Sequence, residues 1–208
     1  MSKYTGPTCK LARREKMDLS LKSGVTSLDK KCDMNRTPGQ GIPRFARASN
    51  YSLQLRTKQK LKRIYGMREK QFKINYRISK NAKGDTSLNL IQRLETRFDN
   101  LLYRMGFSYT RAHARQMINH KAIALNGKAC NIPSAIVKVG DIISIRERAQ
   151  KQVYLLDAIV KAKSNVVLPW VNVNYDQFQG TLVEMPNRDK ILPDINEQLV
   201  VELYSGKK

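Results

Sequence analysis

Two arginines, Arg111 and Arg115, lie four residues apart in a segment whose pattern predicts a helix, so both guanidinium groups leave the same side of it. Gln116, His120 and Lys121 follow closely along the chain. Cationic and polar side chains on one exposed face bind phosphate groups through charge and hydrogen bonds. This stretch therefore predicts an exposed pair of arginines on a surface that grips phosphates.

Catalytic chemistry finds little support in the sequence. His113 and His120 are the only histidines, and each also suits a helix-face or helix-end contact to RNA. The chain has no glycine-rich phosphate loop, no nucleophile elbow and no plausible set of metal ligands. An enzyme is the alternative from a different functional class, but we expect no enzymatic activity.

The cysteines, Cys9, Cys32 and Cys130, are odd in number and far apart in sequence. Disulfides are rare in a reducing compartment, so we expect free thiols. A tetrahedral zinc site needs four ligands, and Cys9 and Cys32 would supply only two. We therefore expect no zinc and no other cofactor.

The elements that position the arginine pair can be predicted from periodicity. A helix over residues 88–105 has a buried stripe that ends at Met105 and stops at Gly106. Thr110 is placed to cap the next helix, which runs to His120. Short alternating runs then flank Asn126-Gly127, a strong hairpin signal, and residues 142–145 add another strand. Residues 97–185 are thus expected to form a module of two helices and a short, mostly antiparallel sheet.

Residues 50–83 form the most basic block, with 11 Lys and Arg against a single acid, Glu69. One helix is expected from a cap at Ser49 or Asn50 to Gly66, and a second carries Lys70, Lys73, Arg77, Lys80 and Lys83 outward. Because acids are almost absent, salt bridges are not expected to explain these charges, and phosphates are. Residues 49–96 are therefore interpreted as a basic helical domain.

The ends of the chain complete the predicted α+β architecture. Residues 1–48 lack a sustained period and are interpreted as a basic arm that orders on RNA, with a disordered tail as the alternative. A helix over 149–163 should turn Val153, Leu156, Ile159 and Val160 inward, and Trp170 should pack rather than stack on a ligand. A carboxy-terminal helix within 186–208 should pack back on the early helices, which makes the basic domain discontinuous.

The overall charge limits the partners. The 208 residues carry 39 Lys and Arg against 17 Asp and Glu, a net charge of +22. Such an excess favours a polyanionic partner, with nucleic acid ahead of an anionic membrane surface. No apolar run approaches the roughly 18 residues that span a bilayer, and the first residues lack the apolar core of a signal peptide. We expect a cytoplasmic protein without a membrane partner.

Several motifs carry a family resemblance. Residues 111–141 contain Arg111-Ala112, Ala114-Arg115-Gln116, His120-Lys121, Asn126-Gly127, Ile132-Pro133-Ser134 and Val139-Gly140-Asp141. They resemble the RNA-binding module named after ribosomal protein S-four. Cys9-Lys10-Leu11, Lys58-Gln59-Lys60, Arg63-Ile64-Tyr65-Gly66, Tyr103-Arg104 and the ending 195–205 extend the resemblance, along essentially the full chain, to the bacterial-type small-subunit ribosomal protein S-four family.

The resemblance implies a structural protein of the small ribosomal subunit that binds its ribosomal RNA early and nucleates assembly of the subunit body. It further implies a place near the mRNA entry path, an influence on translational accuracy, and the third, fifth and twelfth small-subunit proteins as neighbours. Some relatives repress translation of their own operon. A free regulatory or rescue factor that binds RNA off the subunit is the alternative.

The basic blocks and the resemblance together predict a set of RNA-contacting residues: Lys3, Tyr4, Lys10, Arg13, Arg14, Arg44, Arg47, Tyr51, Gln54, Arg56, Lys58, Lys60, Lys62, Arg63, Tyr65, Arg68, Gln71, Arg104, Arg111, Arg115, Gln116, His120 and Lys121. Some family members bind zinc through four amino-terminal cysteines, of which only Cys9 and Cys32 occur here. The family's Pro-Gly-Gln-His-Gly turn reads Pro38-Gly39-Gln40-Gly41, without the histidine.

Overall fold

The computed structural model describes residues 4–39, 49–164 and 168–206. The chain divides into two compact units, residues 1–87 with 194–208, and residues 88–193. The first unit is helical and the second combines helices with a sheet, which confirms the α+β class. The predicted boundary between residues 96 and 97 falls inside the second unit.

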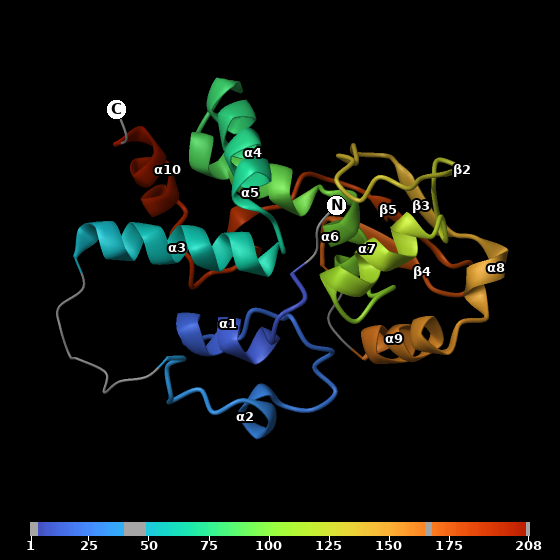
Figure 1. Cartoon of the computed structure of the whole chain (residues 1–208). Helices are drawn as coiled ribbons and strands as arrows, with labels where there is room; N and C mark the ends of the chain where they lie inside the picture. Colours follow the sequence, from blue (N-terminus) through green and yellow to red (C-terminus); the bar gives the residue numbers. More distant parts are fainter. Residues whose placement is uncertain (1–3, 40–48, 165–167, 207–208) are drawn as a thin grey trace. The chain divides into compact units, whose positions relative to one another are not determined.

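The helices of the first unit are α1 (Thr8–Glu15), α2 (Leu28–Lys31), α3 (Asn50–Ile64), α4 (Glu69–Asn81) and α10 (Gln198–Ser205). The Ser49 hydroxyl caps α3 by accepting from the Ser52 N–H, and Gly66 follows its end with a positive φ, both as predicted. The carboxy-terminal α10 packs on α3, although the two lie far apart in sequence (Figure 1). Val200 and Leu203 are the buried residues of α10.

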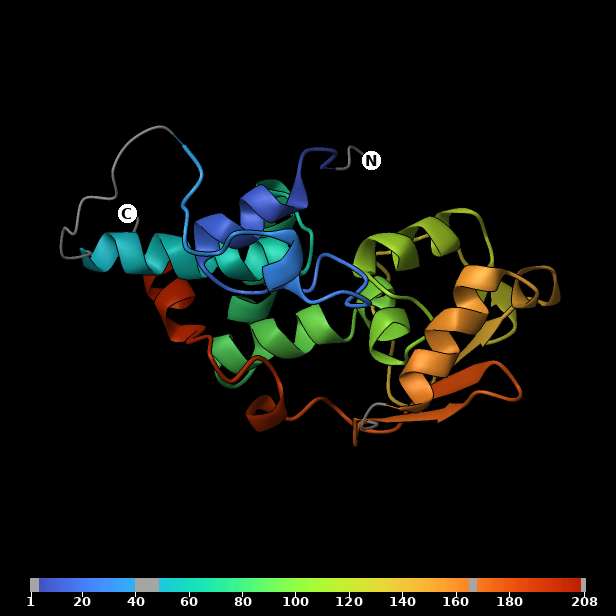
Figure 2. The ribbon, with the colours of Figure 1, turned by 90° about the horizontal axis from the view of Figure 1, so that it is seen from below.

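The amino-terminal segment is more ordered than an extended arm. Helix α1 packs against α3 (Figure 2), with Ala12 and Glu15 on its buried side. Leu19 and Cys32 are also buried. Residues 4–39 are therefore not an extended arm in this structure, because these side chains belong to the core of the first unit. Ordering of the segment on RNA stays a prediction.

The second unit is built on a sheet whose strands are β1 (Ile123–Leu125), β2 (Lys128–Ala129), β3 (Ile142–Ile145), β4 (Val171–Asn174) and β5 (Gln179–Leu182). Their order is β2-β1-β3-β5-β4, and every neighbouring pair is antiparallel. Asn126 and Gly127 take positive φ in the two-residue turn between β1 and β2, as the hairpin signal predicted. Trp170 is fully buried, in agreement with the packing prediction.

The predicted helix over 88–105 is broken into α5 (Thr86–Glu95) and α6 (Phe98–Arg104). Backbone groups at the break bond to a distant loop: the Phe98 N–H donates to the Ala135 carbonyl, and the Val137 N–H donates to the Thr96 carbonyl. These bonds replace the helical ladder, so a tertiary contact interrupts a pattern that is locally continuous. Helix α7 (Arg111–Asn119) follows, and the Thr110 hydroxyl accepts from the His113 N–H as expected of its cap.

The predicted helix over 149–163 is divided into two helices and turns a different face inward. It consists of α8 (Glu147–Gln150) and α9 (Val153–Lys163), followed further on by the short 3-10 helix η1 (Arg188–Lys190). In α9 the buried residues are Leu155, Ala158 and Ile159, whereas Val153, Leu156 and Val160 are exposed. Only Ile159 of the four predicted inward residues is buried.

Among the described residues, no helix combines the length and apolar character that a bilayer crossing requires.

An alanine substitution at Gly106 tests the contact between this residue and α9. The φ of Gly106 is +81°, and a Cβ at this position would overlap the Ala162 Cβ of α9. Gly140 has a similar φ of +90° but open space around the same position. Both alanine substitutions strain the backbone by roughly 1–2 kcal/mol, whereas Gly106→Ala adds an overpacking cost of about 1–3 kcal/mol. Urea unfolding should therefore show a clearly larger loss for Gly106→Ala, and equal losses would contradict the contact with α9.

Candidate nucleic-acid interface

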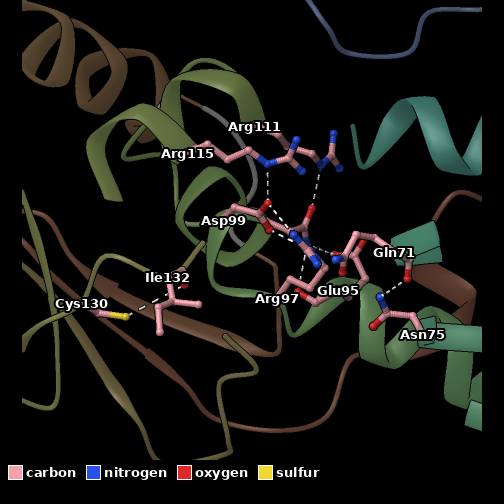
Figure 3. A network of polar contacts seen from close by, with 10 residues as sticks. Gln71, Asn75, Glu95, Arg97, Asp99, Arg111, Arg115, Cys130 and Ile132 are labelled. Atoms are coloured by element: carbon pink, nitrogen blue, oxygen red, sulfur yellow. Dashed lines mark hydrogen bonds and ion pairs between the residues drawn. The ribbon is translucent and has the colours of Figure 1, made fainter. Parts of the chain in front are cut away.

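The arginine pair at the start of α7 is not an exposed phosphate grip. Arg111 is only 5% exposed, its Nε donates to Asn100 Oδ1 over 2.7 Å, and its guanidinium lies 4.4 Å from the centroid of the Tyr103 ring. Arg115 Nε donates to Asp99 Oδ2 over 2.6 Å (Figure 3). The prediction that both side chains project from one exposed face is wrong, because both face groups inside the unit.

These contacts belong to a network around two buried carboxylates, Glu95 and Asp99. Arg104 donates to both oxygens of Glu95, over 2.9 and 2.7 Å. Asp99 accepts from Arg97 through two hydrogen bonds as well as from Arg115. Arg97 is itself buried. Figure 3 shows the side chains of Arg97, Arg115 and Asp99 converging. Since buried carboxylates are stable only when paired, these arginines serve the fold.

In the basic first unit, carboxylates also bind the basic side chains of a neighbouring helix. Arg56 and Arg63 of α3 both pair with Glu15 of α1, whose side chain is fully buried. Lys58 and Lys62, on the same helix, pair with Glu69 over 2.8 and 3.2 Å. The prediction that scarce acids leave α3 without salt bridges is therefore wrong, because Glu15 comes from another part of the sequence and each acid serves two cations.

The pKa of Glu69 is lowered by its partners. Burial on its own would raise the pKa of Glu69, but hydrogen bonds from Lys58, the Tyr204 hydroxyl and Lys62 outweigh it and lower the pKa from 4.5 to about 2. Burial and the negative neighbour in turn raise the pKa of Tyr204. Tyr204 also stacks on Tyr76, with ring centroids 4.6 Å apart. Glu69 thus ties α3, α4 and α10 together.

The remaining predicted RNA contacts vary in exposure. Tyr65, like Lys58, is buried, and Arg13 donates to the backbone carbonyls of Arg36 and Thr37. Gln54 donates to Glu202, and Lys60 is half-buried. Lys3, Arg44 and Arg47 lie outside the described residues. Exposed positions are Tyr4, Lys10, Arg14, Tyr51, Arg68, Gln71, Gln116, His120 and Lys121.

Helix α4 presents cations that the predicted set left out. Its buried residues are Phe72, Asn75, Tyr76 and Ser79. The opposite side exposes what we call the α4 stripe: Lys70, Lys73, Arg77 and Lys80. None of these takes part in an ion pair among the described residues. The sequence pattern had already placed them outward. What it lacked was that four cations of α3 pair with carboxylates, whereas those of the α4 stripe do not.

A second basic corner lies where α7 ends. Arg148 Nη2 donates to the backbone carbonyls of His120 and Lys121, and Arg146 Nη1 donates to that of Lys121. His120, Lys121, Arg146 and Arg148 are all exposed. The predicted set contained His120 and Lys121 but not the two arginines, which are separated from them in sequence and joined to them only by the fold.

The cysteines differ from the expectation of free thiols. Cys9 and Cys32 are joined by a disulfide, with Cα atoms 5.7 Å apart, and Cys130 is free. Spacing along the chain does not predict this pairing, because the two cysteines are 23 positions apart. Within the described ranges, no group of three or more His, Cys, Asp or Glu side chains is arranged to hold a metal ion.

The lowered pKa of Glu69 predicts an acid-dependent loss of stability. Its charge stabilises the folded chain fully above pH 4.5, and this contribution is lost as the pH falls toward about 2. Between pH 6 and pH 3 the free energy of unfolding in urea should therefore fall more steeply for the wild type than for Glu69→Gln. The exposed Glu184→Gln variant is the control and should behave as the wild type. Equal pH dependence in the wild type and Glu69→Gln would contradict this role.

Comparison with known proteins agrees with the two-part organisation. Residues 3–95 match the family model of the ribosomal protein S4/S9 N-terminal domain, and residues 96–143 match that of the S4 domain. Proteins named small ribosomal subunit protein uS4 from Francisella tularensis subsp. holarctica and Francisella philomiragia are 52% identical to this chain over 205 residues, which covers 99% of the chain and the full length of each relative. With this identity along its whole length and both family models in order, the chain belongs to the uS4 family of ribosomal proteins.

Proposed function

We propose that this chain is a structural, non-enzymatic protein of the small ribosomal subunit that binds ribosomal RNA, and that the α4 stripe is a principal phosphate contact. The observation that carries the proposal is the contrast between paired and unpaired cations. Lys58, Lys62 and Arg63 on α3 face carboxylates of the same unit. The four cations of the α4 stripe are exposed and take no part in the ion pairs described above.

The chemistry of the α4 stripe suits an RNA backbone. Its cations recur along one side of the helix for about three turns, at 1.5 Å of rise per residue. Phosphates follow one another at regular spacing along an RNA strand, and their neutralisation releases condensed counterions. Base edges in A-form helices are poorly accessible, so contacts to phosphates and 2′-hydroxyls should supply most of the recognition. The exposed basic corner of His120, Lys121, Arg146 and Arg148 is proposed as a further contact.

From the family relationship we further propose that the chain binds ribosomal RNA early and nucleates assembly of the subunit body. We also propose that it lies near the mRNA entry path, influences translational accuracy and represses translation of its own operon. The third, fifth and twelfth small-subunit proteins are the proposed protein neighbours. No metal or other cofactor enters the proposal.

The RNA-binding proposal is tested by neutralising the α4 stripe. Replacing Lys70, Lys73, Arg77 and Lys80 by glutamine should weaken binding to a small-subunit ribosomal RNA transcript. Because each lost phosphate contact removes about 0.7–0.9 from the slope of log K against log salt concentration, that slope should become shallower by about 3. Filter binding at several salt concentrations measures both effects.

Two matched variants separate the α4 stripe from net charge. Changing Lys70, Lys73 and Lys80 to arginine keeps every charge and should keep the slope. Changing four lysines of the other unit, Lys128, Lys138, Lys151 and Lys190, to glutamine removes the same charge and should change the slope less. If both glutamine variants lose the same slope, net charge and not the α4 stripe binds the RNA.

Arg111→Ala combined with Arg115→Ala is a poor test of phosphate contact in this fold. Removing these side chains would take one hydrogen-bond donor away from Asn100 and one cation away from the buried Asp99, so any loss of binding would be mixed with loss of stability. The α4 stripe avoids this difficulty, because its side chains project from the exposed side of their helix.

A further inference from the structure

The amino-terminal segment is closed by a covalent bond that the proposed function does not explain. Cys9 lies in the first turn of α1, and Cys32 directly follows α2. Between α1 and Cys32 the only helix is the four-residue α2, so the segment has little regular structure of its own. The disulfide therefore fixes α2 relative to α1.

Two non-covalent contacts of this segment can be identified. Leu19 is buried, and Arg13 reaches across to the Arg36 carbonyl over 2.7 Å. By contrast, most of the segment between residues 20 and 31 is exposed or half-buried. With so little buried apolar area, opening of the disulfide should loosen the segment without unfolding the first unit.

The surroundings of the two sulfur atoms favour thiol–disulfide exchange. Cys9 is partly exposed and lies at the amino-terminal end of α1, where the helix dipole favours a thiolate. Lys10 adjoins Cys9, and Lys30 and Lys31 precede Cys32. Asp29 and Asp33 are the acids nearest to Cys32 in sequence. The three lysines beside the two cysteines outnumber these two acids. Cys32 is 95% buried, which leaves Cys9 as the sulfur that an outside thiol or disulfide can reach.

We propose that Cys9 and Cys32 form a redox-sensitive clasp that adjusts the affinity of the chain for RNA, an inference that rests on the proposed function. The oxidant is a low-molecular-weight disulfide such as glutathione disulfide. The Cys9 thiolate attacks one glutathione sulfur, the glutathione S–S bond breaks, and one glutathione thiolate leaves. Cys32 then loses its proton and attacks Cys9 Sγ, which releases the second glutathione. The protein dithiol loses two electrons, and one glutathione disulfide becomes two glutathione molecules.

Formation of the disulfide changes how firmly the exposed cations of the segment are held in position for RNA. Lys10, Arg14, Lys30 and Lys31 are exposed on or beside α1 and α2. In the closed form their backbone positions are fixed before RNA arrives. In the open form RNA must order them, and that entropic cost weakens binding. The oxidised protein therefore binds RNA more tightly.

The test uses the full chain carrying Cys130→Ser, so that only the clasp cysteines remain. Mixtures of reduced and oxidised glutathione set the redox state, and alkylation followed by mass spectrometry measures the disulfide. Limited trypsin digestion reports cleavage after Lys22, and filter binding measures affinity for a small-subunit ribosomal RNA transcript. Cys9→Ser combined with Cys32→Ser is the permanently open control.

The oxidised chain should resist cleavage after Lys22. It should also bind the transcript at least about fivefold more tightly than the reduced chain, which is the lower end of the range of affinity changes that one site usually imposes on another. The double serine variant should match the reduced chain in every buffer. A disulfide that does not form in oxidised glutathione, or equal affinity of both forms, overturns the clasp. Loss of RNA binding in both forms, with trypsin protection intact, instead contradicts the proposed function.

Discussion

The structure depends on placing a small number of carboxylates where arginine and lysine side chains can bind them. A chain with 39 basic and 17 acidic residues repels itself when it becomes compact. Glu15, Glu95 and Asp99 are buried and bound by arginines, and Glu69 holds two lysines. A buried carboxylate is costly without partners, so each of these acids also dictates where its cations must lie. The helices are joined through these acids as well as through the apolar core.

This arrangement divides the basic residues into two groups with different roles. Arg56, Lys58 and Arg104 look like phosphate contacts in the sequence, yet each faces a carboxylate of its own unit. The cations of the α4 stripe lie on a helix whose single acid, Glu69, is already occupied by α3. Pairing inside the fold therefore decides which charges remain for RNA. Counting basic residues in a helix does not reveal this, because a carboxylate from a distant segment can neutralise them.

The amino-terminal segment shows how the same unit can combine firm and adjustable parts. Helix α1 is held by Glu15 and by its contact with α3, whereas the following residues rely on Leu19, Arg13 and the Cys9–Cys32 bond. Stability in proteins is distributed unevenly, and segments with few buried contacts open first. A covalent bond at such a place affects local order more than global stability. That is why the clasp is proposed to tune binding and not folding.

The sequence by itself determined the features that depend on neighbouring residues. The caps at Ser49 and Thr110, the turn at Asn126-Gly127 and the α+β class follow from local backbone preferences and from periodicity. Only the tertiary structure decided the break after Glu95, the buried face of α9, the partners of Arg111 and Arg115, and the pairing of Cys9 with Cys32. Each of these depends on groups that are distant along the chain, such as the Ala135 carbonyl that accepts from the Phe98 N–H. Local sequence patterns carry no information on contacts between distant residues, because burial and charge pairing depend on which segments the fold brings together.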